Sequence, residues 1–417
     1  MTYEALGMTP DINELQKDMK KETEAIHTRF QSSDAYGALS MPVYHTAAYE
    51  FEDAATMADA FCGRIDAPDY SRVTNPTVIY FENKVKALTG AADAIAFSSG
   101  MAAICGTLMC LAGAGKNIVT SRHMFGNTFM LITDTLGRFG VEARLCDLTD
   151  PEEVAAATDG NTCCIYTEII TNPQMEVVDL QKLSETAHSR NIPLVADTTM
   201  IPFTEFSAKE LGVDIEVVSS TKYISGGATS IGGLAIDYGW KSFSDLMRKE
   251  MLMNLGAYMT PHAAYMQALG LETLSVRYAR QSATALEIAQ RLEGHPAIRK
   301  VNCIGLKDNP FHELASRQFG PTCGAMITID LADRDACFSF INRLKLIRRA
   351  TNLFDNKSLA IHPASTIFGN FTPEERAEMD ILDTTIRLSI GLEAPEDILE
   401  DILHALQHTD NHTTALI

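Results

Sequence analysis

The pattern of hydrophobic and polar positions divides the 417-residue chain into three stretches. Residues 1–66 keep no regular period and contain turn residues, which predicts an N-terminal arm. In residues 67–262 short apolar runs alternate with helical patterns, which is typical of an α/β domain. In residues 263–417 long helical patterns surround fewer strands, so we expect a smaller C-terminal α+β domain.

The middle stretch predicts a doubly wound, mostly parallel sheet. Runs such as IPLVAD (192–197) are continuously apolar, as in parallel strands that are buried on both faces. A helical pattern from Val78 to Leu88 precedes the strands, and Gly90 can end that helix. The predicted strands are Ala94–Phe97, Asn117–Thr120, Glu142–Leu145, Cys163–Glu168, Pro193–Asp197, Ile215–Ser219 and Gly232–Asp237.

The last stretch predicts one long helix from Met266 to Leu292, because no glycine follows Gly270 in this pattern. The remaining predicted elements are a strand within 323–331, a helix near 334–345, a strand at 387–391 and a terminal helix at 396–407.

Composition excludes several classes of protein. The formal net charge of −20 disfavours binding to nucleic acid and to anionic membranes. No run approaches the roughly 20 apolar residues of a membrane span, and the first residues lack the apolar core of a secretory signal. We therefore expect a cytoplasmic protein with no nucleic-acid or membrane partner.

Two sets of residues could suggest a metal or redox site. The nine cysteines contain no CxxC pair and several lie in apolar runs, which favours reduced thiols in a cytosolic protein. His404, His408 and His412 have helical spacing, but they straddle the end of the chain, where a frayed tail is the simpler interpretation. We expect no metal.

Polar residues follow several predicted strands, where ligands of open α/β sheets bind. SSG at 98–100 leads into a helix and could bind an anion or simply cap the helix. Asn172 could contact a ligand or form a turn before Pro173. Asp197 needs a cation or hydrogen bonds if it is buried, or it caps a helix.

Lys222 is the sharpest signal, because it follows an apolar strand and lies among hydroxyls and glycines in SSTKYISGG (219–227). Such a lysine can bind phosphate or act as an amine nucleophile. The Walker motif GxxxxGK[ST] is absent. A lysine, the Asp197 carboxylate and an anion-binding helix start together match the aldehyde, ring nitrogen and phosphate of pyridoxal phosphate.

The segment DIEVVSSTKYISGG (214–227) resembles the Schiff-base motif of the Cys/Met-metabolism family of fold-type-I pyridoxal-phosphate enzymes. The resemblance covers nearly the whole chain. Its further motifs are YSRVTNPT (70–77), AFSSGMAAI (96–104), ADTT (196–199), HPAST (362–366) and IRLSIGLE (386–393).

The resemblance implies a role for each matching residue. Lys222 would form the Schiff base and move protons, and Asp197 would pair with the pyridinium nitrogen. Asn172 would approach the phenolic oxygen of the cofactor. The phosphate and the rest of the cofactor would be held by Gly100, Met101, Phe125, Thr199, Ser219 and Thr221.

The resemblance also implies an oligomer and a substrate. Tyr70 and Arg72 would reach the phosphate in a neighbouring subunit, so the active site needs a dimer, and the family is usually tetrameric. Arg387 would bind the carboxylate of an amino-acid substrate with its guanidinium fork, and Asn352 would also belong to the substrate site.

Several positions depart from the family pattern. Phe125 stands where the family usually has a tyrosine that stacks on the cofactor, so the phenol hydroxyl is missing. Asn127 replaces the cysteine of methionine lyases, Gly227-Ala228 replaces the usual His-Gly, and Asp197-Thr198-Thr199 replaces the usual Asp-Asn-Thr. In TNLFD (351–355), Asn352 resembles the form typical of O-acetylhomoserine sulfhydrylases, and Phe354 replaces a glycine.

These features favour a sulfhydrylase of methionine biosynthesis, which would convert O-acetyl-L-homoserine and sulfide, or a thiol, into homocysteine and acetate. The alternative is a methionine or cystathionine γ-lyase that releases 2-ketobutyrate, ammonia and a thiol product. A third interpretation is a catalytically silent protein that keeps the fold, but the presence of Lys222, Asp197 and Arg387 argues against it.

Overall fold

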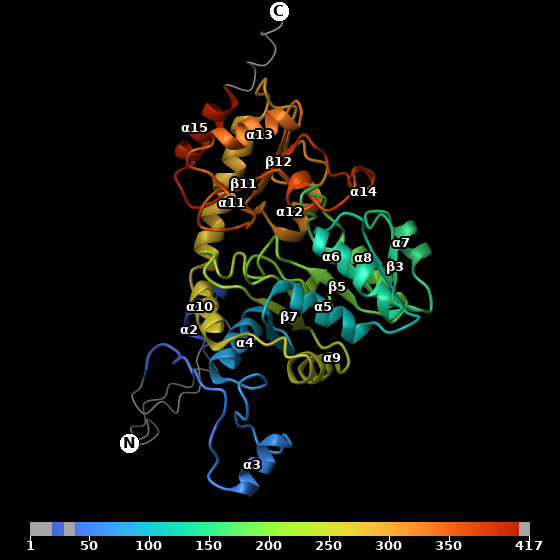
Figure 1. The fold of residues 1–417 in the computed structure, drawn as a ribbon, viewed down its shortest axis with the longest axis vertical. Coiled ribbons are helices and arrows are strands. Elements are labelled where there is room, and N and C mark those ends of the chain that lie inside the picture. The colour runs from blue at the N-terminus through green and yellow to red at the C-terminus, as the bar shows by residue number, and fades with distance from the viewer. Residues whose placement is uncertain (1–18, 29–37, 408–417) are drawn as a thin grey trace, which may run out of the picture.

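Two sheets organise the computed structural model, which describes residues 19–28 and 38–407. The larger has seven strands in the order β1-β7-β6-β5-β4-β2-β3, and the smaller has five in the order β10-β11-β12-β9-β8. Figure 1 shows the smaller sheet and its helices above the large sheet, with the segment around α3 projecting below. The chain therefore has a mixed α/β fold with a second, smaller sheet.

The strands of the large sheet are β1 (Asp93–Phe97), β2 (Asn117–Thr120), β3 (Glu142–Leu145), β4 (Thr162–Glu168), β5 (Leu194–Asp197), β6 (Ile215–Val218) and β7 (Gly233–Asp237). Those of the small sheet are β8 (Lys300–Asn302), β9 (Met326–Asp330), β10 (Arg348–Arg349), β11 (Leu359–Ile361) and β12 (Thr385–Ser389).

The helices are α2 (Lys21–His27), α3 (Ala54–Phe61), α4 (Pro76–Thr89), α5 (Gly100–Leu111), α6 (Gly126–Met130), α7 (Pro151–Ala157), α8 (Leu180–Ser189), α9 (Phe243–Met247), α10 (Pro261–Leu271), α11 (Leu274–Leu292), α12 (His312–Phe319), α13 (Arg334–Arg343), α14 (Pro373–Glu378) and α15 (Pro395–Leu406). Short π-helices are η3 (Leu131–Thr135) and η6 (Arg248–Asn254). Short 3-10 helices are η4 (Gly137–Phe139), η5 (Lys209–Leu211) and η7 (Pro363–Ser365).

The prediction of a mostly parallel sheet is confirmed, and all seven predicted strands form. β2 pairs in parallel with β3 and β4, and β5 pairs in parallel with β4 and β6. β7 is the exception, because it runs antiparallel to both β1 and β6. The predicted helix before the first strand is α4, which ends at Gly90 in the left-handed conformation.

The two faces of the sheet bury alternate residues of each strand. In β1, Ile95 and Phe97 join a hydrophobic cluster with residues of α5 and α9. Ala94 and Ala96 join the opposite cluster, which includes residues of α4, α8 and α11. Both faces are thus covered, which explains why the strands read as continuous apolar runs.

The prediction of one long helix from Met266 to Leu292 is wrong, because α10 ends at Leu271 and α11 begins at Leu274. The buried guanidinium of Arg277 stabilises the break. It donates to the Gly270 carbonyl at 2.7 Å and to Thr273 Oγ1 at 3.1 Å. It also donates to the Tyr223 carbonyl at 2.7 Å, so a contact distant in sequence fixes the break.

The remaining predicted elements of the last stretch are confirmed as β9, α13, β12 and α15. The pattern did not predict β8, β10 and β11, which have only two or three residues each and carry no measurable period. The predicted limits of the arm and of the two domains stay predictions.

Candidate active site

The carboxyl ends of three neighbouring strands meet at one edge of the large sheet. Glu168 at the end of β4 pairs with Asp197 at the end of β5, which pairs in turn with Val217 of β6. A cavity of about 560 Å³ opens there, between the sheet and the C-terminal region. Its lining includes the predicted site residues Gly100, Met101, Phe125, Asn172, Asp197, Thr199, Ser219, Thr221, Lys222 and Arg387.

The start of α5 forms one corner of this cavity. Ser99 caps the helix, since its hydroxyl accepts from the Ala102 amide at 3.1 Å. A Cβ on Gly100 would lie 2.7 Å from that of Ser219, so only glycine allows this close approach. The helix start, with the hydroxyls of Ser219 and Thr221 in the same lining, suits an anion such as a phosphate.

Asp197 is 9% exposed and does not cap a helix, because a turn follows it. Its Oδ1 accepts from the Thr199 amide at 2.9 Å, and Thr199 Oγ1 accepts from the Ser219 amide at 2.8 Å. Burial raises the pKa of the Asp197 carboxyl, while the bonds from Thr199 and the charge of Lys222 oppose the rise. A cation placed against this carboxyl would favour its ionised form.

Lys222 lies in the same cavity, and its ammonium donates to Asn352 Oδ1 at 2.9 Å. Burial lowers the pKa of Lys222 to about 8, the positive charge of Arg387 adds to the fall, and Asp197 opposes it. About a tenth of the amine is therefore neutral at pH 7, far more than for an ordinary lysine, and a nucleophile or a base requires this neutral form. Asn352 does not line the cavity, but its hydrogen bond to Lys222 connects it to a residue that does.

Arg387 of β12 places a buried guanidinium across the cavity from the sheet. It is 2% exposed, and its terminal nitrogens donate to Asn172 Oδ1 at 3.1 Å and to the Asn352 carbonyl at 3.2 Å. Its Nε is buried with no hydrogen-bond partner within residues 19–28 and 38–407. A buried guanidinium with only neutral partners suits a carboxylate ligand, and burial lowers its pKa to about 10.

Phe125 lines the cavity just before α6, and its amide donates to Glu168 Oε1 at 2.7 Å. Sequence reasoning gave Glu168 no role beyond that of the last residue in the predicted strand Cys163–Glu168. Burial, with the charge of Asp197 adding to it, raises the pKa of the Glu168 carboxyl to about 8. The acid at the end of a predicted buried strand, next to Asp197 in the next strand, was the available signal.

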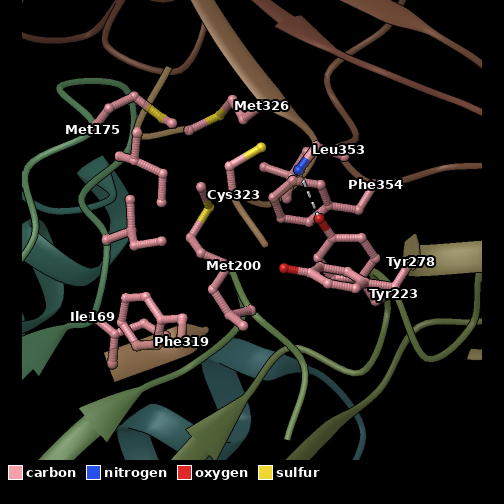
Figure 2. Packing of buried hydrophobic residues seen from close by; sticks show 14 of the residues in the cluster. Ile169, Met175, Met200, Tyr223, Tyr278, Phe319, Cys323, Met326, Leu353 and Phe354 are labelled. Carbon is pink, nitrogen blue, oxygen red and sulfur yellow. Dashed lines mark hydrogen bonds between the residues drawn. The ribbon is translucent and has the colours of Figure 1, made fainter. Parts of the chain in front are cut away.

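Phe354, the bulky residue where the family usually has glycine, packs behind the lysine segment. Its ring stacks on Tyr223, the residue after Lys222, with centroids 4.0 Å apart and planes 6° apart. Figure 2 shows this pair beside Tyr278, which meets Tyr223 edge-on. Phe354 has φ of +58°, a left-handed conformation that favours glycine, so its packing must offset backbone strain.

Tyr70 and Arg72 lie outside the lining of this cavity. Arg72 donates to the carbonyls of Leu252 and Met253, and its guanidinium lies 5.5 Å from the centroid of the Tyr70 ring. Tyr70 is 43% exposed. Their predicted role at a neighbouring subunit stays a prediction.

The other features considered are membrane-spanning helices, metal-binding groups and the cysteines. The helices in the described part of the chain are all too short or too polar to cross a membrane. Within the same residues, no group of three His, Cys, Asp or Glu side chains is arranged for a metal ion. His408 and His412 lie outside the described residues, and the nine cysteines are free thiols.

Comparisons with known proteins agree with this geometry. The model of a family described as "Cys/Met metabolism PLP-dependent enzyme" matches residues 22–407. An L-methionine gamma-lyase of Pseudomonas deceptionensis is 36% identical, over 95% of this chain and 99% of its own length. An O-acetyl-L-homoserine sulfhydrylase of Corynebacterium glutamicum is 33% identical, over 91% of this chain and 95% of its own.

Among solved structures, a Campylobacter jejuni protein described as an O-acetylhomoserine (thiol)-lyase is similar over its whole length. The TM-score is 0.89, the sequence identity is 32%, and the match covers 93% of this chain and 100% of the other. That structure contains a pyridoxyl-lysine monophosphate group.

Proposed function

The chain belongs to the Cys/Met metabolism family of PLP-dependent enzymes, and from this premise we propose that it catalyses a γ-replacement on an activated homoserine ester. The proposed reaction converts O-acetyl-L-homoserine and hydrogen sulfide, or a small thiol, into L-homocysteine or its thioether and acetate. The bond from the γ-carbon to the ester oxygen breaks, and a bond from the γ-carbon to sulfur forms.

Pyridoxal phosphate is the cofactor, and the cavity residues fit its three functional groups. We assign Lys222 to the aldehyde, Asp197 to the ring nitrogen, and the α5 start with Ser219 and Thr221 to the phosphate. When bound, the cofactor supplies an electron sink that stabilises negative charge at the α-carbon of the amino acid.

In this assignment the chain's own residues bind the substrate and move protons. Arg387 holds the α-carboxylate with its guanidinium, which fixes the α-carbon in front of Lys222. The Lys222 amine takes the α-proton and then assists removal of a β-proton, and its lowered pKa suits this exchange near neutral pH. The Asn352 amide holds the lysine at 2.9 Å and so orients it.

The observation that carries the choice of replacement over elimination is the contact between Asn352 and Lys222. The TNLFD segment, which resembles the form typical of sulfhydrylases, reaches the reacting amine itself. Phe125 adds support, because it lacks the phenol that an acid–base step of the lyase type would use.

The second candidate function is a γ-lyase that splits methionine into 2-ketobutyrate, ammonia and methanethiol. The 36% identity to a methionine gamma-lyase favours it, since this is as high as the identity to sulfhydrylases. Both reactions start with removal of the same α-proton, so the residues described above serve either one.

Two parallel assays of the PLP-loaded protein separate the candidates. One contains O-acetylhomoserine with sulfide, the other methionine alone, and homocysteine and 2-ketobutyrate are measured in both. We expect homocysteine from the first and little keto acid from either. Abundant 2-ketobutyrate from methionine alone would contradict the proposal and support the lyase.

The variant Asn352→Ser tests directly whether the contact between Asn352 and Lys222 favours replacement over elimination. Serine is shorter and cannot hold Lys222 at the observed distance, so the ratio of homocysteine to 2-ketobutyrate from O-acetylhomoserine and sulfide should fall several-fold. Asn356→Ser, a nearby asparagine outside the cavity lining, is the matched control. An unchanged ratio in Asn352→Ser would remove the basis for preferring replacement.

We also propose a homotetramer built from dimers that share active sites. Tyr70 is exposed and both Tyr70 and Arg72 lie outside their own chain's cavity, which suits residues that serve a second copy. Mixing Tyr70→Ala protein with Lys222→Ala protein under conditions of subunit exchange should restore activity, because one site then has both residues intact. Failure of two stable, exchanging variants to complement would overturn this arrangement.

A further inference from the structure

Glu168 is a buried carboxyl in the active-site cavity to which the proposed reaction gives no role. It is the last residue of β4, it is 8% exposed, and it lines the cavity. Its partner in the strand ladder is Asp197, so two acids lie next to each other at the same sheet edge. Such a pair is costly to bury unless each carboxyl is hydrogen-bonded, paired with a cation or neutralised by a proton.

The hydrogen bond of Glu168 points to the segment that carries Phe125. Glu168 Oε1 accepts from the Phe125 amide at 2.7 Å, which joins β4 to the turn before α6. On the other side of that turn, a Cβ on Gly126 would lie 3.0 Å from the Ile367 carbonyl, so the turn is packed closely against the C-terminal region. The Phe125 backbone is thus held between a fixed carboxyl and a fixed loop.

We propose that Glu168 is a positioning residue, which fixes Phe125 against the cofactor ring and leaves the negative charge of the carboxyl pair on Asp197. The first half, that Glu168 fixes Phe125, rests on the family resemblance, which implies that Phe125 lies at the cofactor ring, and not on the choice between replacement and elimination. Neither half requires Glu168 to touch the cofactor or the substrate.

The surroundings of the two acids support this division of roles. Asp197 accepts from the Thr199 amide and has the charge of Lys222 nearby, both of which favour its ionised form. Burial is the largest influence on both carboxyls and raises both pKa values, but at Glu168 the charge of Asp197 adds to burial and outweighs the amides of Phe125 and Asn172, so its pKa rises to about 8. A neutral Glu168 still accepts from the Phe125 amide, because the carbonyl oxygen of an acid is an acceptor.

The variant Glu168→Gln provides the sharpest test of the proposal. A glutamine has nearly the same shape, keeps an oxygen for the Phe125 amide, and carries no charge. We expect its affinity for pyridoxal phosphate and its visible circular dichroism to match the parent protein within about threefold. Glu168→Ala removes the acceptor, so its Kd for the cofactor should rise about tenfold, the effect of one buried hydrogen bond.

A double-mutant cycle shows whether Glu168 acts through Phe125. The Kd of apoprotein for pyridoxal phosphate is measured for Phe125→Ala, for Glu168→Ala and for the double variant. If Glu168 only positions the ring, Glu168→Ala should cost little once the Phe125 ring is gone. Additive losses would overturn the proposal, since Glu168 would then act on the cofactor by another route.

Glu216 provides the matched control for burial. It is fully buried in β6, where it accepts from Thr198 Oγ1 at 2.5 Å and the Tyr238 hydroxyl at 2.6 Å, and it is outside the cavity lining. Glu216→Gln should lower the unfolding temperature without changing the Kd or the dichroism. If Glu168→Ala likewise changes only the unfolding temperature, Glu168 is structural and the proposal fails.

The tests of the role of Glu168 are independent of the reaction assays. Cofactor affinity and dichroism are measured without an amino-acid substrate, so they stay valid if the protein turns out to be a lyase. Conversely, a protein that makes homocysteine but fails the double-mutant cycle keeps its proposed function and loses only the role of Glu168.

Discussion

The two walls of the cavity are built in different ways. The sheet wall, formed by Gly100, Glu168, Asp197 and Lys222, consists of strand ends and a helix start that neighbouring strands fix in place. The C-terminal wall includes Thr351, Leu353 and Arg387 and consists of one strand and a loop, and Asn352 and Phe354 belong to the same loop but lie outside the lining.

Bonds across the cavity tie the C-terminal wall to the sheet wall. Arg387 reaches Asn172 at 3.1 Å, and Lys222 reaches Asn352 at 2.9 Å. Gly100, Asp197 and Lys222 lie in segments that match the family motifs, although Phe125, Asn127 and Thr198 near them depart from the family pattern, as Phe354 does in the C-terminal loop. We expect the sheet wall to provide the cofactor chemistry, and the C-terminal wall, through the contact of Asn352 with Lys222, to adjust which reaction follows.

Replacing Lys222 by alanine should have the largest effect, because it removes the amine on which the sheet wall depends. We expect turnover to fall by at least about a thousandfold, and the cofactor to be removable by gel filtration without a carbonyl reagent. Steady-state rates and visible absorption spectra provide the measurement. A variant that retains turnover within tenfold of the parent would mean that the sheet wall does not carry the chemistry.

Substitutions of Phe354 test how much the packing of this residue contributes to the stability of the C-terminal loop. Its side chain is fully buried, so Phe354→Ala should cost about 3–5 kcal/mol of folding stability. Because the backbone is left-handed at +58°, Phe354→Gly should be about 1 kcal/mol more stable than Phe354→Ala, the reverse of the usual order. Urea unfolding of both variants measures the difference, and an alanine variant at least as stable as the glycine variant would contradict it.

Arg387→Lys examines the substrate side of the C-terminal wall. Lysine keeps the charge but loses the planar fork, so the KM for the amino acid should rise about 10- to 100-fold. The Kd for pyridoxal phosphate should change little, because the assigned cofactor contacts belong to the sheet wall. If cofactor affinity falls as much as substrate affinity, the sheet wall does not bind the cofactor independently of the C-terminal wall.

His123 lies outside the cavity, where it links Glu176 to Asp380 of the C-terminal region. Replacing His123 should have the smallest effect of these substitutions. Its Nδ1 lies 2.9 Å from Glu176, and its Nε2 lies 3.1 Å from Asp380 after α14. The hydrogen bond to Glu176 raises the pKa of His123, so its stabilisation is full below the unfolded value and is lost as pH rises through the folded one.

The variant His123→Gln isolates this contribution. The parent should be more stable than the variant by about 1 kcal/mol or less at pH 6, and the difference should shrink toward pH 8. Thermal unfolding at both pH values measures it. A difference that grows with pH would show that the ion pairs to Glu176 and Asp380 do not form.

The elements that could be predicted from the sequence are those determined by local pattern. The strand Asn117–Thr120 was predicted to the residue, because its apolar run lies between glycines and polar residues. The break at 272–273 was missed, because Gly270 was read as an interior glycine of one helix and the stabilising Arg277 contacts Tyr223, which is distant in sequence.

The same distinction holds for the site. Asp197 and Lys222 were found because strand ends show in the sequence, and the structure places both in one cavity. Arg387 was found only through the family resemblance, because its partners Asn172 and Asn352 are joined to it by folding alone. Glu168 was missed, although it ends the strand beside Asp197, because no motif described a role for it.

The position of β7 has a consequence for the order of events in synthesis. β1, which leads into the α5 corner of the cavity, takes its place in the sheet through β7, where Asp93 pairs with Asp237. The large sheet therefore cannot close its β1 edge on the ribosome until β7 has emerged, and Arg387 emerges later still. Pairings this distant in sequence favour slow, late assembly, so the cofactor contacts of the sheet wall should form only after β7 has emerged, and the substrate contact of Arg387 later than these.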